Sequence, residues 1–145
     1  MASDKVAIGK VEMVSLTDSK APRDPLQAFP ETTLEQWRTH FPDLLDRDGK
    51  YQSRYGSAAI RSGGKLIVVD TGLQNPESRL LEDMRKKGID REAVELVVMT
   101  HLHPDHVGWN LTDGRPTFPK ARYLVPKADW DYYTKPSVLE KSPHV

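Results

Sequence analysis

The chain has 145 residues, the size of a single domain, and we expect one domain spanning residues 1–145. Lysine plus arginine and aspartate plus glutamate each number 21, so the formal net charge is zero and nothing favours nucleic acid or an anionic membrane as a partner. The absence of cysteine excludes disulfides, thiolate metal ligands and a cysteine nucleophile. No secretory signal and no apolar run approaching the ~20 residues of a membrane span is found, so we expect a cytoplasmic protein.

The first third of the chain predicts a strand, a loop and a helix. Residues 6–16 are rich in strand-forming side chains, although their alternation slips once, and residues 18–25 contain two prolines that favour a loop. Thr32 or Thr33 is expected to cap the helix that follows, because a glutamate or glutamine lies three residues further on. Pro42 should end this helix.

The middle of the chain predicts a hairpin. Residues 55–61 and 65–69 are the two strands, and Ser62-Gly63-Gly64 joins them with glycines that tolerate the positive φ of tight turns. The second strand is apolar on both faces, which indicates a central, buried position. It ends at Asp70-Thr71-Gly72.

The remaining elements alternate between helix and strand. Asn75-Pro76 is expected to begin a helix that Gly88 closes, and residues 96–99 predict a second buried strand. A further strand over 121–125 and a short helix over 127–133 follow. This order predicts an α/β fold.

Three of the five histidines lie between positions 101 and 106, beside an aspartate. Such crowding is costly to desolvate unless the groups are paired. His101 and His103 should point to the same side of an extended backbone, which Pro104 favours, and Asp105 and His106 can then face the cluster from another direction. The four side chains follow a buried strand, and the end of a strand in an α/β sheet is a usual place for a functional site.

This donor set predicts a metal site for Zn²⁺ or a similar ion, because imidazole and carboxylate ligands suit such metals. Iron or manganese is an alternative metal. Two other interpretations remain open. The segment could be a polar turn with solvated histidines, or it could keep the ligands without binding a metal.

His101-x-His103-x-Asp105-His106, followed by Gly108, resembles the signature loop of the metallo-β-lactamase superfamily. Asp70-Thr71-Gly72 is similar to a second motif of that family, in the same order and with a helix between the two. The absence of cysteine in the loop and the lack of an export signal look more like the lactonase and glyoxalase II branches. The resemblance covers residues 55–133 and, more weakly, the N-terminal segment.

The resemblance implies a dinuclear site. His101 and His103 would bind the first metal, and Asp105 and His106 the second. A hydroxide held between two zinc ions would attack the substrate, and Asp105 would help to orient it. Asp70 would support the metal loop from behind without binding metal.

The sequence departs from the family downstream of the loop. Relatives supply two more histidines and a bridging aspartate, whereas only His144 follows the loop here and lacks the expected motif. The family fold consists of two αββα halves, and the resemblance implies that this chain contains only the first, with a mixed sheet covered by helices. Trp109 stands where many members have a glycine, and its ring is expected to line the pocket.

We therefore expect a metal-dependent hydrolase that acts on a small-molecule ester, lactone or thioester. The missing ligands would come from a C-terminal half or from a second copy in a homodimer. One alternative is a non-catalytic half-domain or fragment that dimerises or lacks a complete site. Another is an iron-dependent oxidoreductase on the same scaffold.

Overall fold

The computed structural model describes residues 4–142, and the chain separates into two compact units. The larger unit contains residues 1–19 and 55–145, and the smaller unit contains residues 20–54. The predicted histidine loop and Asp70 both belong to the larger unit.

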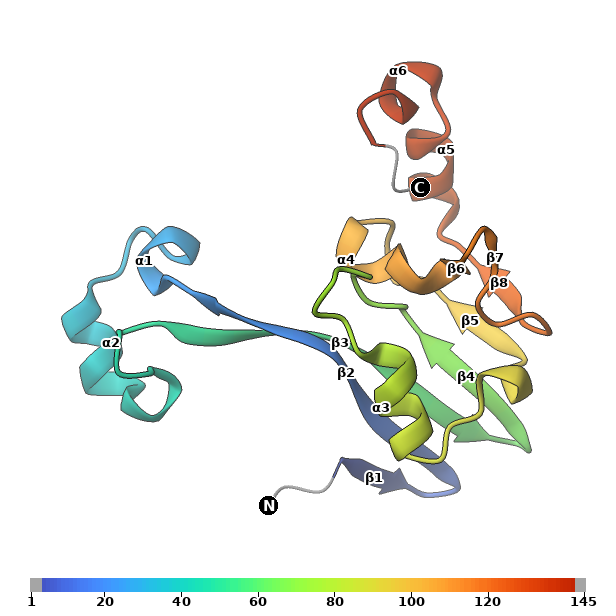
Figure 1. Cartoon of the computed structure of the whole chain (residues 1–145), viewed down its shortest axis with the longest axis horizontal. Coiled ribbons are helices and arrows are strands. Elements are labelled where there is room, and N and C mark those ends of the chain that lie inside the picture. Colours follow the sequence, from blue (N-terminus) through green and yellow to red (C-terminus); the bar gives the residue numbers. More distant parts are fainter. Residues whose placement is uncertain (1–3, 143–145) are drawn as a thin grey trace. The chain divides into compact units, whose positions relative to one another are not determined.

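The larger unit is built on a mixed six-stranded sheet with the order β1-β2-β3-β4-β5-β8 (Figure 1). The pairs β1–β2 and β3–β4 are antiparallel, whereas β4–β5 and β5–β8 are parallel. The strands are β1 (Lys5–Ile8), β2 (Val11–Arg23), β3 (Tyr51–Ser62), β4 (Lys65–Val69), β5 (Leu96–Val98) and β8 (Arg122–Leu124), and a separate ribbon pairs β6 (Leu111–Thr112) with β7 (Arg115–Pro116).

The core lies between one face of this sheet and α3 (Leu80–Lys86). Val68 of β4 and Val97 of β5 are fully buried, and they belong to one cluster with Leu80 and Met84 of the helix. Five helical elements follow α3 in the described part of the chain: η2 (Arg91–Ala93), α4 (Pro104–Val107), η3 (Gly108–Asn110), α5 (Lys127–Tyr133) and α6 (Pro136–Leu139).

The smaller unit contains α1 (Pro25–Ala28), α2 (Leu34–His40) and the 3-10 turn η1 (Pro42–Leu44). Thr33 caps α2 and forms the predicted capping box with Gln36, and the helix ends before Pro42 as expected. Aromatic rings hold this unit together. The Trp37 ring stacks on that of Tyr51 with centroids 5.8 Å apart.

The prediction of one strand over residues 6–16 is wrong, because the chain turns between β1 and β2. Ile8 pairs with Val11, and Gly9 adopts a φ of 60° between them. The slip in the alternation marks this turn. The predicted loop over residues 18–25 is also wrong, since β2 continues to Arg23 and buries Asp18.

The prediction that Asn75 begins a helix is wrong, since α3 begins at Leu80 with Arg79 as its N-cap. The Asn75 carboxamide oxygen instead accepts a hydrogen bond from Glu77 N at 2.9 Å, and Ser78 N donates to the Asn75 carbonyl at 2.9 Å, which stabilises a separate turn. The predicted hairpin is confirmed, because Ser62 pairs with Lys65 and two glycines of positive φ lie between them.

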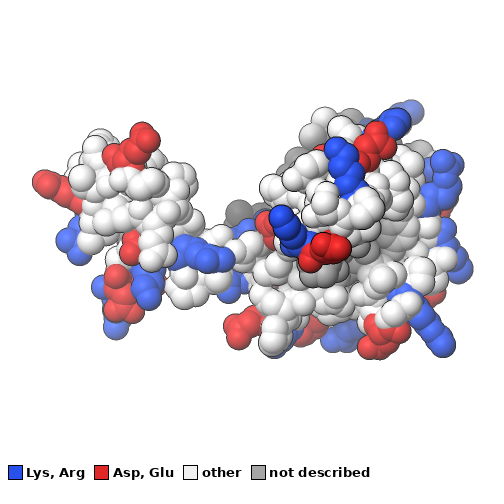
Figure 2. Space-filling view, turned by 90° about the horizontal axis from the view of Figure 1, so that it is seen from above, with Lys and Arg blue, Asp and Glu red and all other residues white. Residues whose placement is uncertain are grey.

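The mixed sheet confirms the predicted α/β class. In Figure 2, positive and negative side chains are interspersed on the face in view, so the residues drawn in colour there form no extended block of one sign. Among residues 4–142, no helix has the length and apolar character needed to cross a membrane.

Candidate metal centre

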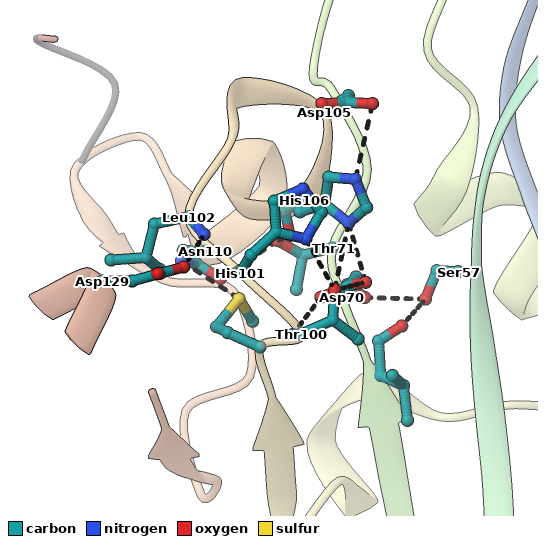
Figure 3. Close-up of polar contacts among 12 residues, drawn as sticks. Ser57, Asp70, Thr71, Thr100, His101, Leu102, Asp105, His106, Asn110 and Asp129 are labelled. Carbon is teal, nitrogen blue, oxygen red and sulfur yellow. Dashed lines mark hydrogen bonds and ion pairs between the residues drawn. The ribbon is translucent and has the colours of Figure 1, made fainter. Parts of the chain in front are cut away.

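The site residues come together because β4 and β5 are parallel neighbours. Val69 pairs with Val98, so Asp70 after β4 and Thr100 and His101 after β5 emerge at the same edge of the sheet. The Asp70 N–H continues the ladder by donating to Val98 O at 3.0 Å. Figure 3 shows these side chains turned towards one another above the strand ends.

Asp70 is the anchor of the site. Its side chain is largely buried, and its backbone has a φ of 58°, a left-handed conformation that aspartate tolerates better than most residues. Oδ1 accepts a hydrogen bond from Thr100 N at 2.7 Å, and Oδ2 accepts from Thr100 Oγ1 at 2.7 Å. Ser57 Oγ donates to the Asp70 carbonyl at 2.7 Å. Both the backbone and the side chain of Asp70 are therefore fixed by hydrogen bonds.

The contacts of Asp70 also determine where two histidines carry their protons. His106 Nδ1 lies 2.8 Å from Asp70 Oδ2, and a carboxylate can only accept, so Nδ1 carries the hydrogen. Thr100 uses its hydroxyl hydrogen on the same Oδ2, and its oxygen therefore accepts from His101 Nδ1 at 3.0 Å. In a neutral imidazole this leaves Nε2 of both His101 and His106 as a bare acceptor.

The other predicted ligands lie beside these two rings. The ring centroids of His101 and His106 are 3.8 Å apart, and those of His101 and His103 are 4.6 Å apart. His103 has extended backbone, as predicted from the following Pro104, which begins α4. Asp105 Oδ2 lies 3.5 Å from His106 Nε2 (Figure 3).

The donor chemistry of this loop fits a metal ion. With its proton on Nδ1, His106 faces Asp105 with two acceptor atoms 3.5 Å apart, and a cation between such atoms would stabilise them. The ligand set is nevertheless incomplete. Within residues 4–142, no group of three or more histidine, aspartate or glutamate side chains has the geometry to hold a metal ion. His144 lies outside the described residues.

The backbone of the loop is fixed by the segment that follows β4. Thr71 N donates to the His106 carbonyl at 2.6 Å, and Thr71 Oγ1 donates to the same carbonyl at 3.1 Å. On the other side, Leu102 N donates to Asp129 Oδ2 of α5 at 3.0 Å. The start and the end of the loop are therefore held by different elements.

Sequence reasoning missed Thr100 and Asp129. Thr100 was recognisable as the residue that joins a buried strand to the first histidine, where a hydroxyl can reach both neighbours. Asp129 gives no such signal, because it contacts Leu102 across 27 positions of sequence. Trp109 does not behave as expected, since it packs against the core and its indole N–H donates to Asp18.

Comparisons with known proteins find similar sequences and similar folds. Residues 57–125 match the family model described as the metallo-beta-lactamase superfamily. A mouse (Mus musculus) relative, metallo-beta-lactamase domain-containing protein 1, is 37% identical over 92 residues, which are 57% of this chain and 34% of the relative. A metal-dependent hydrolase of Aeropyrum pernix is 41% identical over 49 residues, which are 34% of this chain and 18% of that protein.

Solved structures show the same fold. The hydrolase AbOPH of the beta lactamase superfamily gives a TM-score of 0.82 at 23% identity, covering 97% of this chain and 50% of that one. AidC, described as a dizinc quorum-quenching lactonase, gives 0.76 at 24% identity, covering 89% and 46%. The chain thus spans about half the length of these structures, and it has the fold of their matching half. Together with the motif geometry, the match shows that residues 57–125 belong to the metallo-β-lactamase superfamily.

Proposed function

We propose that this protein is a metal-dependent hydrolase acting on a small ester, lactone or thioester, with its site built on the loop from His101 to His106. The observation that carries the proposal is the hydrogen-bonded chain that begins at Asp70. These hydrogen bonds favour the tautomer of His101 and His106 that has its proton on Nδ1, and both Nε2 atoms can then act as metal ligands. A purely structural turn has no need to present two bare acceptors beside a carboxylate.

The ligands divide into two groups in this proposal. His101 and His103 hold a first metal, and Asp105 and His106 hold a second. Zinc is the preferred ion because imidazole and carboxylate suit it, and iron or manganese has compatible donor preferences. A zinc ion held by such donors supplies Lewis acidity and makes water a stronger acid near neutral pH.

The chain's own residues position the reacting groups. Asp70 keeps the His101 and His106 rings in one tautomer through Thr100 and by direct contact. Asp105 has a partly exposed carboxylate beside His106 Nε2, where it can accept a hydrogen bond from an attacking water and orient it towards a carbonyl carbon.

The substrate class rests on the relatives. One structural neighbour is described as a lactonase and another as a hydrolase. Because this chain spans about half of those structures, the walls that select a substrate lie largely outside it. We propose that the missing ligands come from a C-terminal half or from a second copy of this chain.

Metal content and hydrolysis test the proposal together. The full chain, with its oligomeric state recorded, is titrated with Zn²⁺ and assayed on ester, lactone and thioester substrates. The variant His103→Ala should lose zinc, whereas His40→Ala, which removes an exposed histidine of the smaller unit, should keep it. Equal zinc content in both variants would contradict the role given to His103.

The incomplete ligand set favours one second candidate, a half-domain that does not catalyse and instead associates with a partner. The same titration separates the two. A chain that stays metal-free at saturating zinc supports the half-domain. Coloured protein with bound iron would support an oxidoreductase instead.

A further inference from the structure

Asp18 is a buried carboxylate that the proposed chemistry does not use. It lies in β2 with a relative exposure of 1%. Its Oδ1 accepts from Trp109 Nε1 at 2.9 Å and from Leu80 N at 3.2 Å, while Oδ2 accepts from Leu73 N and Ser78 Oγ, each at 2.8 Å. Burying a carboxylate is costly, and here four donors offset that cost.

The four donors come from three separate segments. Leu73 belongs to the segment after β4, Ser78 and Leu80 to the turn before α3 and the first residue of α3, and Trp109 to η3, which follows the metal loop His101–His106. Asp18 and Trp109 are 91 positions apart in the sequence. The carboxylate therefore ties the loop to the sheet and to α3 at one point.

Two glycines bring these segments unusually close. A Cβ added at Gly72 would lie 2.8 Å from Asp18 Cγ, and one added at Gly108 would lie 2.3 Å from the Leu73 carbonyl carbon. Neither space can accept a methyl group unless atoms move, and at Gly108 those atoms are backbone. Gly72 is thus in close contact with Asp18, and Gly108 is in close contact with Leu73. The segment after β4 is therefore packed tightly between β2 on one side and the start of η3 on the other.

Backbone hydrogen bonds connect the layers to His106. Thr71 N donates to His106 O at 2.6 Å, Gly108 N to Gly72 O at 2.8 Å, and Trp109 N to Thr71 O at 3.0 Å. A shift of Trp109 therefore displaces the backbone that carries His106. The shortest polar contact of the His106 imidazole is the 2.8 Å from its Nδ1 to Asp70 Oδ2, and a shift of the backbone of His106 would change this distance.

We propose that Asp18 and Trp109 act as a positioning pair, whose hydrogen bond fixes the end of the metal loop so that His106 keeps its place against Asp70. The consequence for metal binding rests on the proposed function. Neither residue touches a metal or a substrate in this proposal. The hydrogen bonds from Leu80 N and Ser78 Oγ connect Asp18 to the start of α3. The hydrogen bond from the Trp109 indole connects Asp18 to the metal loop instead, so its loss should affect the loop rather than α3.

The test replaces Trp109 by phenylalanine, which keeps an aromatic ring and removes the N–H. Trp130→Phe is the matched control, because it makes the same chemical change at a half-exposed residue of α5. Amide hydrogen exchange is measured in the metal-free full chain. The amides of Thr71, Gly108 and residue 109 should exchange about 10–100-fold faster in Trp109→Phe, the effect of losing a hydrogen bond to a charged group.

The pattern of exchange separates positioning from general stability. Amides of β4 and β5 should keep their wild-type rates, and the control should change none of these rates. Unchanged exchange at the three loop amides would overturn the proposal. A uniform acceleration of all protected amides would also overturn it, since that result indicates a purely structural role. If Trp109→Phe does not fold, Trp109→Tyr, which also lacks the indole N–H and keeps an aromatic ring, provides the same readout.

Zinc affinity provides the second readout. Trp109→Phe should weaken zinc binding by about 10–100-fold, as is typical when a group that positions metal ligands is lost. Trp130→Phe should bind as the wild type does. Loop exchange that rises without any change in zinc affinity would refute the link to the metal loop. A wild-type chain that binds no zinc would refute the proposed function, while the exchange rates would still decide whether the positioning pair exists.

Discussion

The substitution Asp70→Asn tests the hydrogen-bonded chain that fixes the site. Asparagine has the same shape and also tolerates a φ of 58°, so the backbone is not strained. One of the two carboxylate oxygens becomes an NH₂ group. With the amide oxygen kept on Thr100 N, the new NH₂ group faces His106 Nδ1 and Thr100 Oγ1, both of which donate to Asp70 in the wild type.

The magnitude follows from the three bonds to Asp70. Hydrogen bonds to a charged acceptor contribute about 1.5–3 kcal/mol each and neutral ones about 0.5–1.5 kcal/mol, so losing the charge at three bonds should destabilise the fold by about 2–4 kcal/mol. His106 must also accept the new N–H at Nδ1, which moves its own proton to Nε2. A protonated Nε2 cannot bind metal, and zinc affinity should fall about 10–100-fold.

Nitrogen-15 NMR of the imidazoles reads the tautomer directly, and urea unfolding and zinc titration give the two magnitudes. Asp113→Asn is a close control, because Asp113 is exposed and has a φ of 51°. The control should leave the His106 tautomer and the zinc affinity unchanged. If Asp70→Asn retains the proton on His106 Nδ1 and binds zinc as tightly as the wild type, then the hydrogen bonds of Asp70 do not set the tautomer of His106.

Three further substitutions test other parts of the structure. Gly108→Ala should lower the free energy of unfolding, measured in urea, by about 3 kcal/mol, because the added Cβ would lie 2.3 Å from a backbone carbon. A smaller loss than that of Gly88→Ala would argue against this close approach. Burial raises the pKa of Tyr123 above 10.0, so the folded chain holds this proton more tightly than the unfolded chain and stability falls as the pH rises above that value. Tyr123→Phe should show less of this loss as the pH rises above about 10, and an identical loss would exclude Tyr123 as its source. Thr33→Ala should destabilise the smaller unit by about 1 kcal/mol, because the N-cap of α2 is lost, and unfolding monitored by Trp37 fluorescence measures this change. Thr33→Ser keeps a capping hydroxyl and should not destabilise the unit.

Sequence alone predicted the parts of the fold that depend on near neighbours. The capping box at Thr33 and the glycine turn of the β3–β4 hairpin are set within a few residues, and both are confirmed. The helix over residues 127–133 has the predicted bounds. Each of these features follows from local hydrogen bonds and backbone preferences, which a short segment of sequence contains.

The errors occurred where distant residues determine the conformation. Asp18 was placed in a loop because of its charge and the nearby prolines. In the structure its partners lie at least 55 positions away, and they make a buried strand position favourable. Asn75 has the side chain of an N-cap, yet its carboxamide is used within a turn, so α3 begins later. A short segment of sequence does not show which of several possible hydrogen-bond partners a polar side chain will have in the folded protein.

The candidate site also has parts that the sequence predicted and parts that only the structure showed. The order of ligands from His101 to His106 was visible in the sequence, and the ring contacts agree with that spacing. The hydrogen bonds of Thr100 to Asp70 and of Trp109 to Asp18 join residues 30 and 91 positions apart, so the sequence did not show these partners. The candidate ligands were therefore visible in the sequence and their role as metal ligands stays a prediction, whereas the groups that contact them required the structure.

In the proposed function, the groups that orient the histidines and the groups that complete the set of metal ligands belong to different parts of the protein. The hydrogen bonds that orient His101 and His106 all lie within the larger unit, and they need no metal to form. A preorganised set of donors reduces the entropy that metal binding must overcome. Supplying the remaining ligands, from a C-terminal half or a second copy, should therefore raise zinc affinity without changing the tautomers of these two histidines. Imidazole NMR before and after that addition would show the same Nδ1 protons, and a switch to Nε2 would mean that the loop is not preorganised.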